Sequence, residues 1–142
     1  MKRQFVPLFF LLLFALSLTT QGGWAQAPDT SAAQLSAQSW LSLVDSQNYG
    51  ASWVNAASAF RARVTREQWD RAVRAARTPF GDLKSRTVKS VAASTTLPGA
   101  PDGEYVTVQF DTAFAQKAEA VETVISMRDT DREWHVAGYF VR

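Results

Sequence analysis

Few side chains in this sequence have the types and spacing that enzyme chemistry needs. The chain contains one histidine, His135, and no cysteine, which excludes cysteine–histidine catalysis and leaves no thiolate for a zinc site. No serine lies in a G-x-S-x-G segment, and no glycine-rich phosphate loop is present. The acidic segment from Asp129 to Asp131 lacks the calcium-loop pattern, so we predict a turn there. We therefore expect no catalytic residue, no metal site and no cofactor.

Three side chains leave an enzymatic alternative open. Asp111 lies on the polar face of a predicted strand, where a carboxylate in a pocket could act as a base. Tyr139 and His135 lie near the end of the chain, and either could line the same pocket. The alternative function is thus a small pocket enzyme that transfers a proton with a carboxylate and a tyrosine. The simpler interpretation makes all three exposed or hydrogen-bonded residues of a sheet.

Glu122 is the acidic residue hardest to place, because it shares a strand face with the apolar Val124. Two interpretations fit the sequence. In the first, Glu122 forms a cross-strand pair with Arg128 or Arg142. In the second, its strand face is exposed to solvent and Val124 is a single apolar neighbour. The sequence leaves both open.

An arginine-rich segment, residues 61–77, contains six arginines. Thr65 and Gln68 form a capping-box pattern that begins a helix within it. The apolar side of this helix carries Trp69 and faces the core. The polar side carries Arg66, Arg71, Arg74 and Arg77, with Glu67 and Asp70 interleaved at i,i+4 spacing. We predict a solvated face with internal ion pairs and no binding of nucleic acid.

The N-terminal segment, residues 1–25, has the three parts of a secretory signal peptide. Lys2 and Arg3 precede an apolar stretch, and a small-residue cleavage site ends at Ala25. This stretch is shorter than the ~20 residues that span a bilayer, so we expect no stable membrane anchor after cleavage. The mature protein is predicted to be exported, periplasmic or extracellular, with residues 26–31 as a disordered lead-in. Without Lys2 and Arg3, its 13 basic side chains balance its 13 acidic ones.

Residues 32–142 are predicted to form a single α+β domain, with helices first and strands after. Apolar residues recur at helical spacing in three segments, residues 31–47, a shorter helix around 53–60, and 65–78. Apolar and polar residues then alternate in four predicted strands, residues 83–97, 105–115, 118–128 and 133–142. The short turns between these strands favour an antiparallel meander. We therefore expect three helices packed across a curved four-stranded antiparallel sheet.

Several stretches of the chain resemble a known family. They are SWLSLVDSQNYGASW (39–53), GDLKSR (81–86), LPGAPDGEYVTVQFDTAF (97–114), AVET (120–123) and EWHVAGYFVR (133–142). Together they resemble the bacterial exported family called domain of unknown function 4019. This family has no assigned activity, so the resemblance implies no functional residue. The arrangement is also similar, more loosely, to the cystatin-like and nuclear-transport-factor-2-like folds, whose curved sheets often enclose a pocket.

The predicted sheet carries more apolar surface than three helices of modest length can cover. Val106, Val108, Phe110 and Phe114 share one face of their predicted strand, and Trp134, Val136 and Phe140 share one face of the last. Surplus apolar surface on a soluble protein usually forms a ligand pocket or a partner interface. We therefore predict an exported, non-catalytic module that binds a small apolar ligand or a protein partner through Trp134, Tyr139 and Phe110. The other interpretation is that the helices seal this face completely.

Overall fold

The computed structural model describes residues 27–142, in which helices precede strands. The helices are α1 (Ser31–Asp45), α2 (Tyr49–Val54), α3 (Ser58–Arg63) and α4 (Arg66–Arg77), followed by the 3₁₀ turn η1 (Thr78–Phe80). The strands are β1 (Leu83–Ser94), β2 (Tyr105–Phe114), β3 (Lys117–Arg128) and β4 (Trp134–Val141). The predicted signal peptide, residues 1–25, lies outside the described residues. No helix between residues 27 and 142 combines the length and apolarity that crossing a membrane requires.

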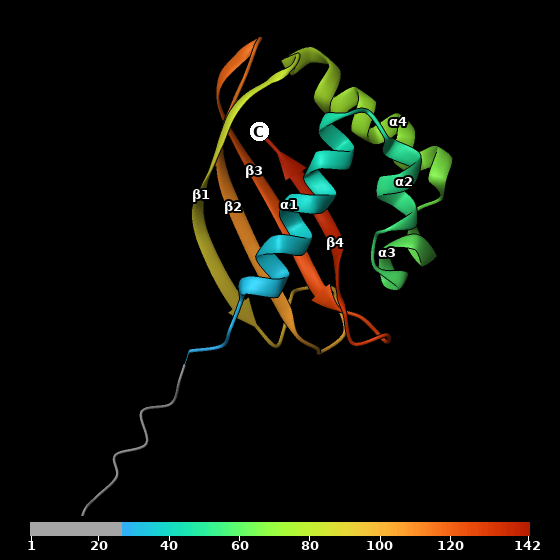
Figure 1. Cartoon of the computed structure of the whole chain (residues 1–142). Helices are drawn as coiled ribbons and strands as arrows, with labels where there is room; N and C mark the ends of the chain where they lie inside the picture. The colour runs from blue at the N-terminus through green and yellow to red at the C-terminus, as the bar shows by residue number, and fades with distance from the viewer. Residues whose placement is uncertain (1–26) are drawn as a thin grey trace, which may run out of the picture.

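The four strands form one antiparallel sheet in the order β1-β2-β3-β4, so each strand pairs with its neighbours in the sequence. Helix α1 runs across one face of this sheet, while α2, α3 and α4 gather on the side of β4 (Figure 1). We call the face under α1 the inner face and the opposite face the outer face. The predicted α+β class and the antiparallel meander are confirmed.

The region predicted as one short helix forms two helices, α2 and α3. Between them the chain leaves the helical path, and the Ala57 N–H donates to the Val136 carbonyl at 2.8 Å. This bond satisfies a backbone group at the edge of β4, where an unpaired strand would otherwise present it to solvent. The described residues therefore contain four α-helices where three were expected.

Helix α4 begins at the predicted capping box. The Gln68 N–H donates to Thr65 Oγ1 at 3.2 Å, and the Thr65 N–H donates to Gln68 Oε1 at 2.9 Å. Each bond satisfies a backbone donor that has no partner within the helix, which favours a helix start at this position.

The core lies between the inner face and the helices. Its fully buried members include Ala33, Ala37, Leu41 and Val44 from α1, and Val106, Val108, Phe110 and Val124 from the strands. Aromatic rings extend this core toward α4. The ring of Trp69 lies 5.6 Å from Trp40, 5.4 Å from Phe60 and 6.4 Å from Tyr139, measured between ring centroids. These tilted and edge-on arrangements are the ones that aromatic quadrupoles favour.

A β-bulge in β4 changes which side chains face the core. The register shifts between the pairs Ile125–Gly138 and Ser126–Val136, which leaves Ala137 without a partner. An extra residue reverses the alternation of the residues that follow it. Tyr139 consequently faces the helices, and Phe140 is 62% exposed on the outer face. The prediction that Phe140 shares a face with Val136 is therefore wrong.

Candidate functional site

A cluster of charged and polar side chains lies between the inner face and the helices. We call it the buried ionic cluster. Its six members are Asp45 (α1), Arg77 (α4), Arg86 (β1), Thr112 (β2), Glu122 (β3) and Tyr139 (β4). Since every strand and two helices contribute one side chain, the cluster joins segments that lie far apart in the sequence.

Arg86 bridges the two carboxylates of the cluster. Its Nε donates to Glu122 Oε1 at 2.7 Å, while Nη1 and Nη2 donate to the two oxygens of Asp45 at 2.7 and 3.0 Å. Such paired, charge-assisted bonds are the strong geometry for a guanidinium. Burial alone would lower the pKa of Arg86, but the bonds and charges of Asp45 and Glu122 raise it. Arg86 thus links α1 to β3 as a permanent cation.

Glu122 is 0% exposed, and each of its oxygens accepts hydrogen bonds. Thr112 Oγ1 donates to Oε1 at 2.7 Å, and the Tyr139 hydroxyl donates to Oε2 at 2.5 Å. Both earlier interpretations of Glu122 are wrong, because its partners are neither Arg128 nor Arg142 and its face is buried. A carboxylate is tolerated on the inner face here because Arg86 neutralises its charge and the two hydroxyls donate hydrogen bonds to its oxygens.

Arg77 closes the cluster from α4. Its Nη2 donates to Asp45 Oδ1 at 2.8 Å, and its Nη1 lies 3.8 Å from Glu122 Oε2. The guanidinium stacks over the Phe114 ring at 4.7 Å, a cation–π contact. With Arg86 it balances the two carboxylates, so the cluster has two positive and two negative charges.

The predicted placement of Arg77 on a solvated face is wrong, since the residue is only 6% exposed. At 3.6 residues per turn Arg77 lies about 80° from Trp69 around the helix axis, on the flank of the buried side. Arg74 does lie on the solvated side, where its Nε pairs with Asp70 at 2.7 Å. The i,i+4 ion pair predicted between these two residues is confirmed.

The cluster is a network of paired groups in which, among the described residues, only the buried Nε of Arg77 lacks a hydrogen-bond partner. Burial, and then the adjacent Glu122 carboxylate, raise the pKa of Tyr139 far above its ordinary value, so the hydroxyl stays protonated as a donor. Burial would raise the pKa of Asp45, but the bonds from Arg86 and Arg77 hold it below the ordinary value. All four carboxylate oxygens already accept hydrogen bonds. This arrangement favours holding the helices on the sheet over transferring a proton.

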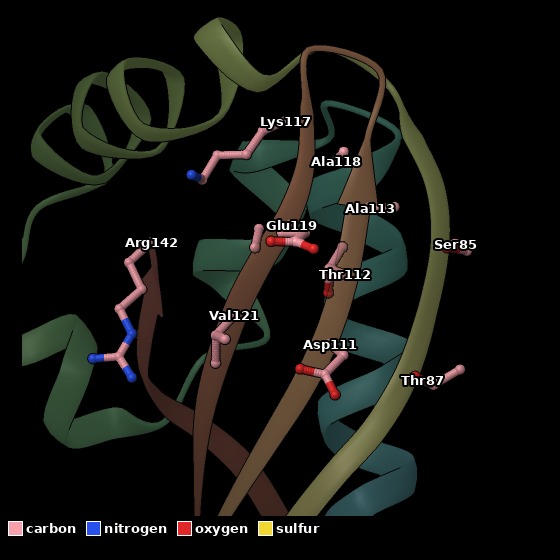
Figure 2. Close-up of a pocket in the computed structure, with 11 residues that line it drawn as sticks. Ser85, Thr87, Asp111, Thr112, Ala113, Lys117, Ala118, Glu119, Val121 and Arg142 are labelled. Atoms are coloured by element: carbon pink, nitrogen blue, oxygen red, sulfur yellow. The ribbon is translucent and has the colours of Figure 1, made fainter.

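The three residues of the enzymatic alternative lie in separate places. Asp111 is exposed on the outer face, 3.5 Å from Lys89 Nζ, and it lines a polar hollow of about 660 Å³ (Figure 2). Tyr139 belongs to the buried ionic cluster on the inner face. His135 lies near the β3–β4 turn, with Nε2 2.7 Å from Asp131 Oδ2. The convergence on one cavity that would support proton transfer is therefore not observed.

The β3–β4 turn is held against the α2–α3 linker and the first residue of α3. Asp129 accepts hydrogen bonds from the Ser58 hydroxyl and the Ser58 N–H, both at 2.6 Å, and these bonds lower its pKa to about 2. His135 Nδ1 lies 3.2 Å from the Asn55 carbonyl. The predicted turn at residues 129–131 is confirmed. Between residues 27 and 142, no group of three or more acidic or histidine side chains is arranged to hold a metal ion.

An apolar groove of about 330 Å³ lies at the other end of the outer face. We call it the outer groove. Its floor is formed by Tyr105, Ile125, Met127, Gly138 and Phe140, and its walls by residues 97–101 and by Ala59, Phe60, Arg63 and Val64. The loop wall is held in place, because the Tyr105 hydroxyl donates to the Pro101 carbonyl at 2.5 Å. Gly99 in this loop has a φ of 76°, a conformation that favours glycine.

The outer groove does not include the binding residues that the sequence suggested. Phe110 is buried in the core, and the Tyr139 hydroxyl bonds to Glu122. Trp134 is half-buried near the start of α1, where its carbonyl accepts a bond from the Ser36 hydroxyl at 2.7 Å, and it lines a separate hollow. The sequence signal for the groove was the apolar outer face of β3, where Ile125 and Met127 alternate with the buried residues.

Within residues 27–142, the fold and the site define a small α+β domain with four α-helices, a charged cluster in its core and an apolar groove on its outer face. The chain belongs to the family described as "Protein of unknown function (DUF4019)", whose model matches residues 36–139. The family resemblance drawn from the sequence is confirmed, and the match contains the whole buried ionic cluster. No curated protein and no solved structure matches the chain. The looser likeness to cystatin-like and nuclear-transport-factor-2-like folds stays a prediction.

Proposed function

We propose that this protein is an exported, non-catalytic module that binds a small apolar ligand in the outer groove. The observation that carries the proposal is the groove itself, a concave volume of about 330 Å³ lined by neutral, mostly apolar groups and one charged side chain, Arg63. Ligand sites typically have volumes of ~300–1,000 Å³, apolar walls and few polar groups. The proposed binding surface is therefore the outer face of the sheet. It is not the inner face that the sequence suggested, because the helices cover that face.

The exposure of Phe140 supports this proposal. A phenylalanine that is 62% exposed keeps a large apolar surface in contact with water, and exposed apolar patches commonly mark binding sites. The groove walls are also held before any ligand arrives, since the Pro101 carbonyl accepts the Tyr105 bond and Gly99 accepts a longer one from Arg63 at 3.5 Å. A preformed site loses less conformational entropy on binding.

Export is proposed from the N-terminal sequence. The charged, apolar and small-residue parts of residues 1–25 are those of a signal peptide. We expect the exported protein to begin at Gln26 or, as the second choice, at Pro28. Mass spectrometry of the protein from the exported fraction measures this terminus. An intact Met1 on protein found in the membrane fraction would contradict export with cleavage.

Replacing Phe140 with serine should weaken ligand binding at least about tenfold. Loss of a large apolar contact costs on the order of 1.5–3 kcal/mol, which corresponds to a tenfold or larger change in Kd. Because the side chain is mostly exposed, we expect the free energy of unfolding to change little. The measurement is a titration of the purified protein with an apolar fluorescent dye, followed by dye and tryptophan emission.

The matched control is Val88→Ser, which removes an apolar strand residue that is 44% exposed and does not line the groove. Its dye affinity should equal that of the unchanged protein. Loss of binding in Trp134→Ala but not in Phe140→Ser would place the ligand beside α1 and contradict the groove assignment. Sedimentation tests the alternative, a protein partner, because a second copy seated on the groove would give a dimer that Phe140→Ser disrupts.

A further inference from the structure

Arg63 is the one charged side chain among the residues that line the outer groove. It ends α3 at the groove wall, opposite a floor made of Ile125, Met127 and Phe140. Its guanidinium makes one long hydrogen bond, from Nη1 to the Gly99 carbonyl at 3.5 Å. A guanidinium has five N–H donors, so most of the donors of Arg63 are available to a ligand.

No carboxylate neutralises Arg63 within residues 27–142, because none of the ion pairs there includes it. The loop next to the groove contains two acidic residues, Asp102 and Glu104. Glu104 pairs with Arg128 at 3.5 Å, and neither Glu104 nor Asp102 lines the groove. The groove therefore combines an apolar floor with one uncompensated positive charge on its wall.

We propose that the ligand of the outer groove is an amphipathic anion, with a short hydrocarbon body on the apolar floor and one carboxylate at the Arg63 guanidinium. This inference rests on the proposed function and specifies its ligand class. A guanidinium matches a carboxylate with two parallel hydrogen bonds, and these charge-assisted bonds are stronger than neutral ones. The size agrees, since a water molecule takes about 30 Å³ and the groove volume therefore holds on the order of ten non-hydrogen atoms.

The test compares octanoate, 1-octanol and octylamine as ligands of the purified protein by isothermal titration calorimetry at pH 7. The three probes share the same hydrocarbon body and differ in the charge of the head group. We expect octanoate to bind at least about tenfold more tightly than octanol, because the head group gains charge-assisted bonds. Octylamine, a cation at this pH, should bind most weakly.

Two variants locate the effect. Arg63→Gln should remove the preference for octanoate and leave the affinity for octanol unchanged. The matched control is Arg61→Gln, which removes the same charge from an exposed residue of α3 outside the groove lining and should keep the preference. An equal loss in both variants would show a general electrostatic effect and would overturn the assignment to Arg63.

The remaining outcomes separate the two proposals. Equal affinities for octanoate and octanol, both unchanged in Arg63→Gln, would overturn the anionic ligand and leave the apolar site standing. No saturable binding of any of the three probes would overturn both proposals. A short apolar peptide with a free C-terminal carboxylate is included in the same assay, and tighter binding of this peptide than of octanoate would replace the small-molecule assignment with a protein partner.

Discussion

Arg86→Met is expected to lower the free energy of unfolding by about 3–5 kcal/mol, the usual cost of removing one partner from a buried ion pair. The substitution keeps a long apolar side chain but removes the cation that contacts both carboxylates of the buried ionic cluster. Glu122, which is 0% exposed, would retain only its two hydroxyl donors and the more distant Arg77. Equilibrium unfolding in urea, followed by far-UV circular dichroism, measures the loss.

The control for this prediction is Arg74→Met, the same chemical change in an exposed ion pair. Arg74 lies 2.7 Å from Asp70, the distance found between Arg86 and Glu122, but both members of this pair are solvated. Exposed pairs contribute little, so Arg74→Met should destabilise the protein far less than Arg86→Met. Equal losses in the two variants would mean that burial of the cluster contributes nothing.

A double variant tests whether the loss comes from the unpaired charge. Adding Glu122→Gln to Arg86→Met removes the stranded carboxylate and keeps an oxygen for Thr112 or Tyr139. The effects of substitutions at contacting residues are not additive. The free energy of unfolding should therefore fall less in the double variant than the sum of the two single losses. Strict additivity would contradict a direct interaction between Arg86 and Glu122.

The cluster also makes the free energy of unfolding depend on pH in the acid range. The pKa of Asp45 is lower in the folded protein than its ordinary value, which lies near 3.9 in an unfolded chain. The stabilisation is therefore complete above about pH 5, roughly one unit above the unfolded value, and is lost as the pH falls through the lower, folded value. In Arg86→Met this carboxyl keeps only its bond from Arg77, so the variant should lose less of its remaining stability on acidification.

The order and type of the elements could be predicted because they depend on local signals. The capping box at Thr65 located the start of α4, and alternation located all four strands within a few residues. The split between α2 and α3 could not be predicted in this way. It depends on the backbone hydrogen bond from Ala57 to Val136, a residue nearly eighty positions later. No local sequence pattern predicts that bond.

The site could be predicted only in part, because periodicity shows which residues share a face but not which face is buried. The odd positions of β3 are more apolar than the face of Glu122, yet they lie on the outer face, where Ile125 and Met127 line the outer groove. Glu122 is buried because Arg86, from a distant strand, neutralises it. The bulge at Ala137 then reverses the alternation of side chains in the last strand, which exposes Phe140. These effects arise from tertiary pairing, so the sequence pattern alone does not contain them.

Trp69→Ala should lower the free energy of unfolding by about 3–5 kcal/mol, the range for removing a large aromatic side chain from a core. Trp69 is 6% exposed, and its ring packs between Trp40 and Phe60. Its indole N–H also donates to the hydroxyl of the buried Ser52 at 2.9 Å. Alanine would therefore leave both a cavity and a missing hydrogen bond. Thermal and urea unfolding of the purified protein measure the loss.

Two further variants separate the cavity from the hydrogen bond and test which side of α4 is buried. Trp69→Phe keeps an aromatic ring but removes the indole N–H, and the Ser52 hydroxyl can still donate to the Tyr49 carbonyl, so the loss should be well below that of alanine. Arg71→Ala changes the exposed side of the same helix and should alter stability by no more than about 0.5 kcal/mol. If Trp69→Ala changed the free energy of unfolding little and Arg71→Ala lowered it strongly, the assignment of the helix faces would be reversed. If the loss of stability comes mainly from the cavity, Trp69→Ala is the least stable protein, Trp69→Phe is intermediate and the unchanged protein is the most stable. The reason is that the phenylalanine ring refills most of the space that alanine leaves.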